Sequence, residues 1–252
     1  MFAHPPTILL HGFSQTVQCF RPVLLRIDKR FDLRPQPLPG HVDGLSLERG
    51  EPFDAVVDRF AAELIGRGLR DLHLVGYSLG ARLALALLVR HRALFRAATL
   101  IGCHPGLSEP FERTARAQRD AQWIETLRAR GVEEFAQKWE QQPLFATQTA
   151  LPESVRSEQR AERLRHDPEQ LARALESLGL AQMPCFLDDL PGLTQPVDVL
   201  AGAVDEPFCA LADAIASRLP RARVGIIPRA GHNAVLENPL TVARWIEERA
   251  SV

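Results

Sequence analysis

Short apolar runs alternate along much of this chain with longer stretches in which apolar residues recur every three or four positions. The runs are typical of buried strands, and the longer stretches are typical of amphipathic helices. Strands that alternate with helices predict a mostly parallel sheet with helices on both of its faces. The expected strands are residues 7–10, 31–37, 72–75, 97–102, 196–202 and 223–227, and the helices expected beside them are 53–65, 79–89, 208–219 and 239–249.

The alternation stops between about residues 106 and 183, where we find no convincing strand and a charged, helical pattern instead. A stretch of this length is too long for an ordinary connection between two strands. We interpret it as a helical cap inserted over the sheet, with 1–103 and 187–252 as the core and 104–186 as the cap. Within it, helices are expected at 112–130, 132–139, 153–165 and 168–178.

The pentapeptide Gly76-Tyr77-Ser78-Leu79-Gly80 lies between an expected strand and an expected helix. This is the context of a nucleophile elbow, a turn so tight that side chains two residues to either side of the serine would collide with their surroundings. The turn would hold the Ser78 hydroxyl at a helix N-terminus, where backbone N–H groups favour a developing anion. The motif also occurs by chance, so its meaning depends on the rest of the chain.

Ser78, Asp205 and His232 each follow an expected strand, and their order along the chain is that of α/β-hydrolases. The carboxyl ends of parallel strands lie at one edge of the sheet, so we expect the three side chains to converge there. In such a triad the histidine takes the serine proton and the aspartate fixes the histidine tautomer. Singly, they could be a turn serine, a helix N-cap and a loop histidine. Asp198 is a rival acid, but it lies inside its strand.

The first expected strand ends in His11-Gly12-Phe13, and α/β-hydrolases place one oxyanion-hole N–H in this early loop. We expect the N–H groups of Phe13 and Leu79 to bind negative charge that develops on the substrate. The alternative for His11-Gly12-Phe13 is an ordinary turn at a strand end. Together with the triad, the pattern predicts an α/β-hydrolase fold with an inserted helical cap.

Composition narrows the class of partner. The formal net charge of the 252 residues is -1, so no overall charge would attract nucleic acid or an anionic membrane. Lysine occurs only at Lys29 and Lys138, and anion binding should therefore depend on arginine. We expect a small-molecule substrate as the partner, and a monomer or weak homo-oligomer.

Other patterns bear on compartment and cofactors. No apolar run is long enough to span a bilayer, and residues 1–6 lack the pattern of a signal peptide. The four cysteines are scattered and fit neither a zinc motif nor a disulfide framework. We therefore expect a cytoplasmic protein with free thiols and without a metal or cofactor.

Several further motifs lie in both the core and the cap. They are Gly76-Tyr77-Ser78-Leu79-Gly80-Ala81-Arg82, His104-Pro105-Gly106-Leu107, Glu112-Arg113 with Arg116, Asp120 and Trp123, Trp139-Glu140-Gln141-Gln142-Pro143-Leu144-Phe145, Gln182-Met183-Pro184 and Ile227-Pro228-Arg229-Ala230-Gly231-His232-Asn233. Together, from about residue 7 to residue 249, they resemble the MenH family of 2-succinyl-6-hydroxy-2,4-cyclohexadiene-1-carboxylate synthases, which act in menaquinone biosynthesis. The cap motifs are more specific for this family than the elbow.

The resemblance implies a lyase on a hydrolase scaffold. The family's substrate, 2-succinyl-5-enolpyruvyl-6-hydroxy-3-cyclohexene-1-carboxylate, loses pyruvate when a ring proton is removed, with the serine as base and without an acyl-enzyme. The resemblance also implies that Arg82, Arg116 and Arg163 bind the several substrate carboxylates, and that Tyr77 and Trp139 line the site.

Alternatives stay open from the residues alone. Arg116 and Arg163 could belong to solvated helix faces, and Arg160 and Arg165 compete with Arg163 for its role. The chain could instead be a serine hydrolase, either a carboxylesterase or a C–C bond hydrolase acting on a small acid. It could also be a ligand-binding module without activity, although an intact triad argues against this. Arginines in the pocket favour the lyase, because an esterase pocket is mostly apolar.

Overall fold

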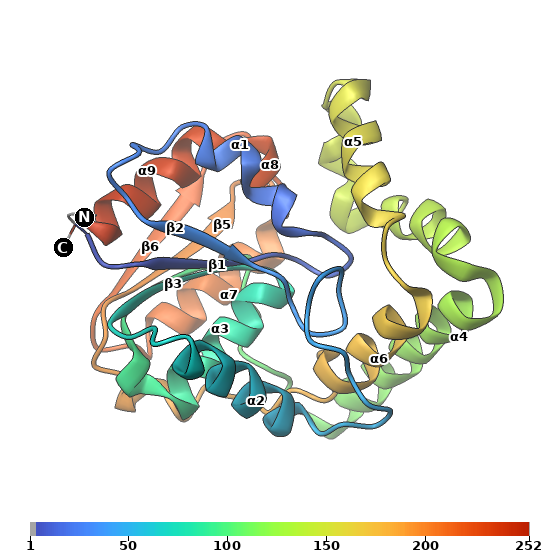
Figure 1. Cartoon of the computed structure of the whole chain (residues 1–252), viewed down its shortest axis with the longest axis horizontal. Helices are drawn as coiled ribbons and strands as arrows, with labels where there is room; N and C mark the ends of the chain where they lie inside the picture. Colours follow the sequence, from blue (N-terminus) through green and yellow to red (C-terminus); the bar gives the residue numbers. More distant parts are fainter. Residues whose placement is uncertain (1–3, 252) are drawn as a thin grey trace.

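The computed structural model describes residues 4–251, so residues 1–3 of the N-terminal stretch considered above, and residue 252, lie outside it. A twisted sheet of six parallel strands forms the centre of the molecule (Figure 1). The strands lie side by side in the order β2-β1-β3-β4-β5-β6. They are β1 (Thr7–Leu10), β2 (Leu33–Gln36), β3 (Leu72–Tyr77), β4 (Phe95–Ile101), β5 (Val197–Gly202) and β6 (Ala222–Ile227). The predicted α/β architecture is confirmed, and all five strand pairings are parallel where a mostly parallel sheet was expected.

Helices cover both faces of the sheet, and the strands separate two apolar clusters. In β1, Ile8 and Leu10 belong to one cluster and Leu9 to the other, because successive side chains of a strand point to opposite faces. The first face carries α2 (Phe53–Gly66), α3 (Leu79–Arg90) and α7 (Glu206–Ala216), and the second carries α1 (Arg21–Leu24), α8 (Ala234–Glu237) and α9 (Pro239–Ala250) (Figure 1). Three short 3₁₀ helices complete the core: η1 (Val17–Phe20), η2 (Arg92–Leu94) and η4 (Leu190–Gly192).

The chain between β4 and β5 is helical and lies beyond the carboxyl ends of the strands (Figure 1). It contains α4 (Pro110–Glu140), η3 (Pro143–Ala150), α5 (Glu153–Arg163) and α6 (Pro168–Leu178). Gly131 interrupts α4 with φ 80° and ψ -179°, at the position between the two helices expected there. The sequence pattern did not indicate η3. We call this segment the cap; its limits at residues 104 and 186 stay a prediction.

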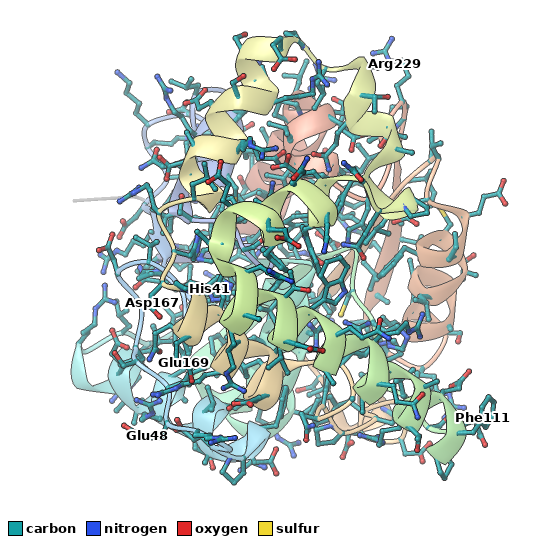
Figure 2. All side chains as sticks on the ribbon, turned by 90° about the vertical axis from the view of Figure 1, so that its right-hand side faces the viewer. His41, Glu48, Phe111, Asp167, Glu169 and Arg229 are labelled. Atoms are coloured by element: carbon teal, nitrogen blue, oxygen red, sulfur yellow. The ribbon has the colours of Figure 1, made fainter. Side chains whose placement is uncertain are left out.

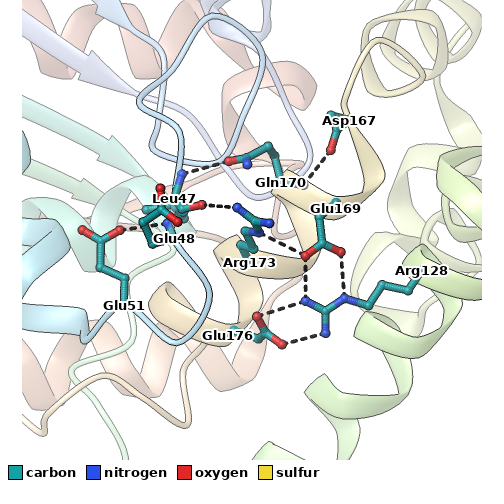
Figure 3. A network of polar contacts seen from close by, with 9 residues as sticks. All are labelled: Leu47, Glu48, Glu51, Arg128, Asp167, Glu169, Gln170, Arg173 and Glu176. Atoms are coloured by element: carbon teal, nitrogen blue, oxygen red, sulfur yellow. Dashed lines mark hydrogen bonds and ion pairs between the residues drawn. The ribbon is translucent and has the colours of Figure 1, made fainter.

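The cap has an apolar centre of its own, and both apolar and polar contacts join it to the core. Phe135 and Leu171 are fully buried where α4 packs on α6. Arg128 on α4 donates to Glu169 at 2.8 Å and to Glu176 at 2.7 Å, both on α6 (Figure 3). Arg173 of α6 donates in turn to the Leu47 carbonyl in the loop after β2, at 2.8 Å. The Arg128 ion pairs thus hold α4 to α6, and the Arg173 hydrogen bond holds α6 to the loop after β2.

Helix α5 is attached more sparsely. Its one buried residue is Arg163, and its other contacts with the core include an Arg21–Glu158 ion pair and a hydrogen bond from Thr16 to Glu162, both at 2.8 Å. Exposed ion pairs of this kind contribute little to stability.

No helix within residues 4–251 is both long and apolar enough to cross a membrane.

Candidate active site

Ser78 sits on the turn between β3 and α3 with φ 53° and ψ -111°, a strained conformation for a residue with a side chain. The two flanking glycines are required by close packing. A Cβ on Gly76 would lie 2.3 Å from the Gly80 carbonyl oxygen, and one on Gly80 would lie 2.1 Å from the Leu10 carbonyl oxygen. Both obstacles are backbone atoms that cannot move aside. The elbow geometry expected from the sequence is therefore present.

The structure brings Ser78, His232 and Asp205 together. The Ser78 Oγ lies 3.0 Å from His232 Nε2, and His232 Nδ1 lies 2.8 Å from Asp205 Oδ2. A carboxylate can only accept, so Nδ1–H donates to Asp205, and Nε2 is left with a lone pair for the serine hydroxyl. Asp205 and His232 are buried. The geometry is that of a general base poised to take the serine proton.

The loops that carry the acid and the base are joined to each other. Val204 N–H donates to the Ala230 carbonyl at 2.9 Å, and Gly202 approaches the Gly231 carbonyl too closely for a Cβ. The rival acid Asp198 is buried earlier in β5 and is held by Arg223 and Arg249. Asp205 stands at the N-cap position of α7, but its side chain makes no capping hydrogen bond.

The early loop lies against the start of α3, because Gly80 N–H donates to the His11 carbonyl at 3.0 Å. The N–H groups of Phe13 and Leu79 have no protein acceptor within residues 4–251. Leu79 is the first residue of a twelve-residue helix, where the helix dipole favours an anion. Both N–H groups are thus free to stabilise charge beside Ser78.

A cavity of about 580 Å³ opens over Ser78 and His232, between the sheet edge and the cap. Phe13 and Leu79 line it, and so do all five side chains expected to bind substrate: Tyr77, Arg82, Arg116, Trp139 and Arg163. Arg160 and Arg165 do not line it; they pair with Glu140 and Glu162. Of the three competing arginines, Arg163 is therefore the one that lines the cavity.

The arginines differ in how their charge is balanced. Arg116 donates to Asp120 at 2.8 Å, and Arg163 pairs with Glu140. Arg82, one turn beyond Ser78, donates to the Leu178 carbonyl at 2.8 Å, and no carboxylate within residues 4–251 pairs with it. Burial, and then the charge of Arg116, lowers the pKa of Arg82 to about 9. A half-buried cation without an ion-pair partner can bind an anion.

The similarity of the chain to known proteins agrees with this geometry. The Alpha/beta hydrolase family matches residues 7–245. A 2-succinyl-6-hydroxy-2,4-cyclohexadiene-1-carboxylate synthase of Enterobacter sp. (strain 638) is 35% identical over 244 residues, 97% of this chain and 91% of the relative. One from Escherichia coli (strain SMS-3-5 / SECEC) is 34% identical over 238 residues, 94% of this chain and 90% of the relative. This chain belongs to that family of enzymes.

A solved structure extends the match from sequence to fold. The structure of MenH from S. aureus superposes with a TM-score of 0.91 at 26% identity, covering 98% of this chain and 93% of that one. The resemblance read from the sequence is confirmed at the level of the family. The roles of the individual site residues stay predictions.

Several residues that line the cavity of this MenH-family chain were not expected in the site. Phe208 packs on His232 with ring centroids 4.4 Å apart, and Phe145 of η3 lies 6.4 Å from the same ring. Arg119 follows Arg116 by one helical turn and also lines the cavity. The spacing of three residues along α4 is the signal that could have found Arg119.

His104 is a further polar residue of the cavity. Burial, and then the charges of Arg82 and Arg116, lowers its pKa to about 4, so the ring is neutral near pH 7. Its Nδ1 accepts from Gly106 N–H at 3.1 Å, which leaves Nε2–H as a donor. Trp139 Nε1 is buried without a partner within residues 4–251 and is a second donor.

No group of three or more His, Cys, Asp or Glu within residues 4–251 could hold a metal ion.

Proposed function

We propose that this chain is a lyase that eliminates pyruvate from 2-succinyl-5-enolpyruvyl-6-hydroxy-3-cyclohexene-1-carboxylate and yields 2-succinyl-6-hydroxy-2,4-cyclohexadiene-1-carboxylate. Membership of the synthase family supports the reaction, since relatives that span nearly the whole chain carry the name of this product. The observation within the site that supports it most is Arg82. It is a half-buried cation beside Ser78, without a carboxylate partner, in a cavity large enough for such a substrate.

The positions of the double bonds in the substrate and in the product define the reaction. The ring hydrogen at C2 is acidic because C2 bears the succinyl ketone. With His232 as proton acceptor, Ser78 Oγ takes this proton, and charge develops on the ketone oxygen, where the N–H groups of Phe13 and Leu79 can bind it. The electrons then form C2=C3, the former C3=C4 bond shifts to C4=C5, and the C5–O bond breaks. The leaving oxygen keeps the C5–O electron pair and takes the proton held by His232, so the leaving group departs as the enol of pyruvate.

The proposed substrate carries three carboxylates, and the arginines of the cavity can accommodate them. Arg82 belongs to α3, one turn after the elbow, whereas Arg116 and Arg163 come from the cap helices α4 and α5. A planar guanidinium suits a carboxylate because two parallel N–H groups can bind its two oxygens. Tyr77 and Trp139 would pack against the ring and complete the pocket. Binding therefore draws on both the sheet edge and the cap.

A serine hydrolase is the second candidate, because the same triad and free N–H groups would also support an acyl-enzyme. The charge at Arg82, which has no carboxylate partner among the described residues, weighs against a neutral ester. A non-catalytic binding protein is a weaker candidate, since binding alone does not require the Ser78–His232–Asp205 arrangement.

The proposed function is tested by incubating the purified protein with the enolpyruvyl substrate. Pyruvate is followed with a coupled dehydrogenase, and the product is followed by the absorbance of its new diene. We expect both signals to rise together and in equal amounts. Hydrolysis of p-nitrophenyl acetate, without release of pyruvate from the enolpyruvyl substrate, would instead identify a hydrolase.

A further inference from the structure

We propose that His166 is a positioning residue that fastens the cap to the oxyanion loop, defined here as residues 11–16. The inference rests on the proposed function, in which the N–H of Phe13 in this loop binds the developing oxyanion. His166 lies just after α5, at its joint with α6, and it does not line the cavity. Its effect on the reaction would therefore be transmitted through the loop.

His166 connects two chain segments that lie far apart in the sequence. Its Nδ1 is 2.9 Å from the Arg163 carbonyl in the cap, and its Nε2 is 3.1 Å from the Gln15 carbonyl in the oxyanion loop. The side chain of Arg163 makes a parallel connection, because its Nε donates to Ser14 Oγ at 3.1 Å. Arg163, the residue proposed to bind a substrate carboxylate, is thus tied to the loop through its own side chain, and His166, three residues further along the chain, can make a second link at Gln15.

The oxyanion loop needs such support because its backbone is strained. Ser14 has φ 56°, a left-handed conformation that costs free energy for a residue other than glycine. Ser14 N–H donates to His41 Nε2 at 3.1 Å, and Gly12 N–H donates to the Gln15 side chain at 3.2 Å. These bonds flank Phe13 on both sides. The free N–H of Phe13 is therefore aimed by the residues before and after it.

His166 packs on His41, with ring centroids 5.4 Å apart in an edge-to-face arrangement. In Figure 2, the labels of His41 and of Asp167, the neighbour of His166, lie close together near the start of α6. His166 is therefore in contact with both supports of the loop: it reaches Gln15 directly and Ser14 through His41. A cap that shifts with substrate would move the oxyanion loop with it.

One feature of the ring decides which substitution can replace it. Burial is the largest influence on His166 and lowers its pKa, so the ring is neutral near pH 7. A neutral imidazole has a single N–H, yet both of its nitrogens face carbonyl oxygens. It can donate to only one of them at a time. Glutamine, whose amide nitrogen reaches about as far as Nε2, should therefore preserve the bond to Gln15, whereas leucine cannot.

The experiment compares His166→Leu, His166→Gln and the control His73→Leu with the wild-type chain. His73 is also a fully buried histidine, and its Nε2 lies 2.9 Å from Thr99 Oγ1, but it is near the start of β3 and far along the strand from Ser78. Two measurements are made: amide hydrogen exchange at Gly12 and Ser14, and steady-state kinetics of pyruvate release, which give kcat and KM.

For His166→Leu we expect exchange at Gly12 and Ser14 to accelerate about tenfold or more, and kcat to fall about tenfold with a smaller change in KM. His166→Gln should recover most of both losses. His73→Leu should lower the melting temperature and leave exchange in the oxyanion loop and kcat unchanged.

Unchanged exchange at Gly12 and Ser14 in His166→Leu would overturn the inference. So would a loss of kcat in His73→Leu equal to that in His166→Leu, because the effect would then report general destabilisation. A wild-type protein that releases no pyruvate would refute the proposed function, and the exchange measurement would still decide whether His166 holds the loop.

Discussion

Replacing Arg82 by lysine separates charge from geometry at the centre of the proposed site. The guanidinium gives one N–H to the Leu178 carbonyl at 2.8 Å, and its remaining N–H groups are free for a carboxylate of the substrate. Lysine keeps the positive charge, but a single ammonium group cannot reproduce both contacts with the fork geometry of arginine. We therefore expect the loss of about one hydrogen bond to a charged group, which is worth about 1.5–3 kcal/mol.

That free energy corresponds to a fall in kcat/KM for pyruvate release of about 10- to 150-fold. Arg90→Lys is the matched control, because Arg90 lies at the far end of the same helix and binds Asp58 with two hydrogen bonds. The control should change kcat/KM less than twofold. Melting temperatures of both variants show whether the fold is retained. Equal kcat/KM values for the two variants would refute the assignment of Arg82 to substrate binding.

Three further outcomes follow from the structure. Arg119→Gln should lower kcat/KM about two- to fivefold and weaken its dependence on salt, since Arg119 lines the cavity, whereas Arg130→Gln, farther along the same helix and outside the cavity lining, should do neither. Arg249→Met should lower the free energy of unfolding in urea by about 1.5–3 kcal/mol and leave kcat unchanged, because the buried carboxylate of Asp198 loses its hydrogen bonds from Arg249 and keeps only those from Arg223. Burial lowers the pKa of His73 from 6.5 to about 3. Between these pH values the unfolded chain binds this proton and the folded chain does not, so acid destabilises the fold. His73→Gln should therefore recover about 2 kcal/mol of the stability that is lost between pH 7 and pH 5.

The sheet could be predicted because each of its signals is local. Residues 72–75 are buried on both faces and are apolar except for His73. The glycines around Ser78 are dictated by backbone contacts within a few residues and by the neighbouring strand β1. The placement of Asp205 and His232 then follows from strand ends that share one edge. Even the break in α4 at Gly131 could be anticipated, since glycine is a poor residue for a helix interior.

The details of the cap could not be predicted in the same way. Arg160, Arg163 and Arg165 lie within two turns of one another, and only the positions of Glu140 and Ser14 determine that Arg163 is buried. Helix η3 has no apolar periodicity, yet its Thr147 packs on Gly231 and its Phe145 lies near His232. These contacts join segments about 20 to 150 residues apart, and no pattern within one segment contains them.

The central claim is that Ser78 acts as a base in an elimination, and the mass of the intact enzyme during turnover tests it most directly. Wild-type protein is mixed with an excess of the enolpyruvyl substrate, quenched while pyruvate is being released, and weighed by mass spectrometry. We expect unmodified enzyme at every time point, and a fall of about 10³-fold or more in pyruvate release for Ser78→Ala. An adduct on Ser78 that forms and decays at the rate of pyruvate release, or a fully active Ser78→Ala, would contradict it.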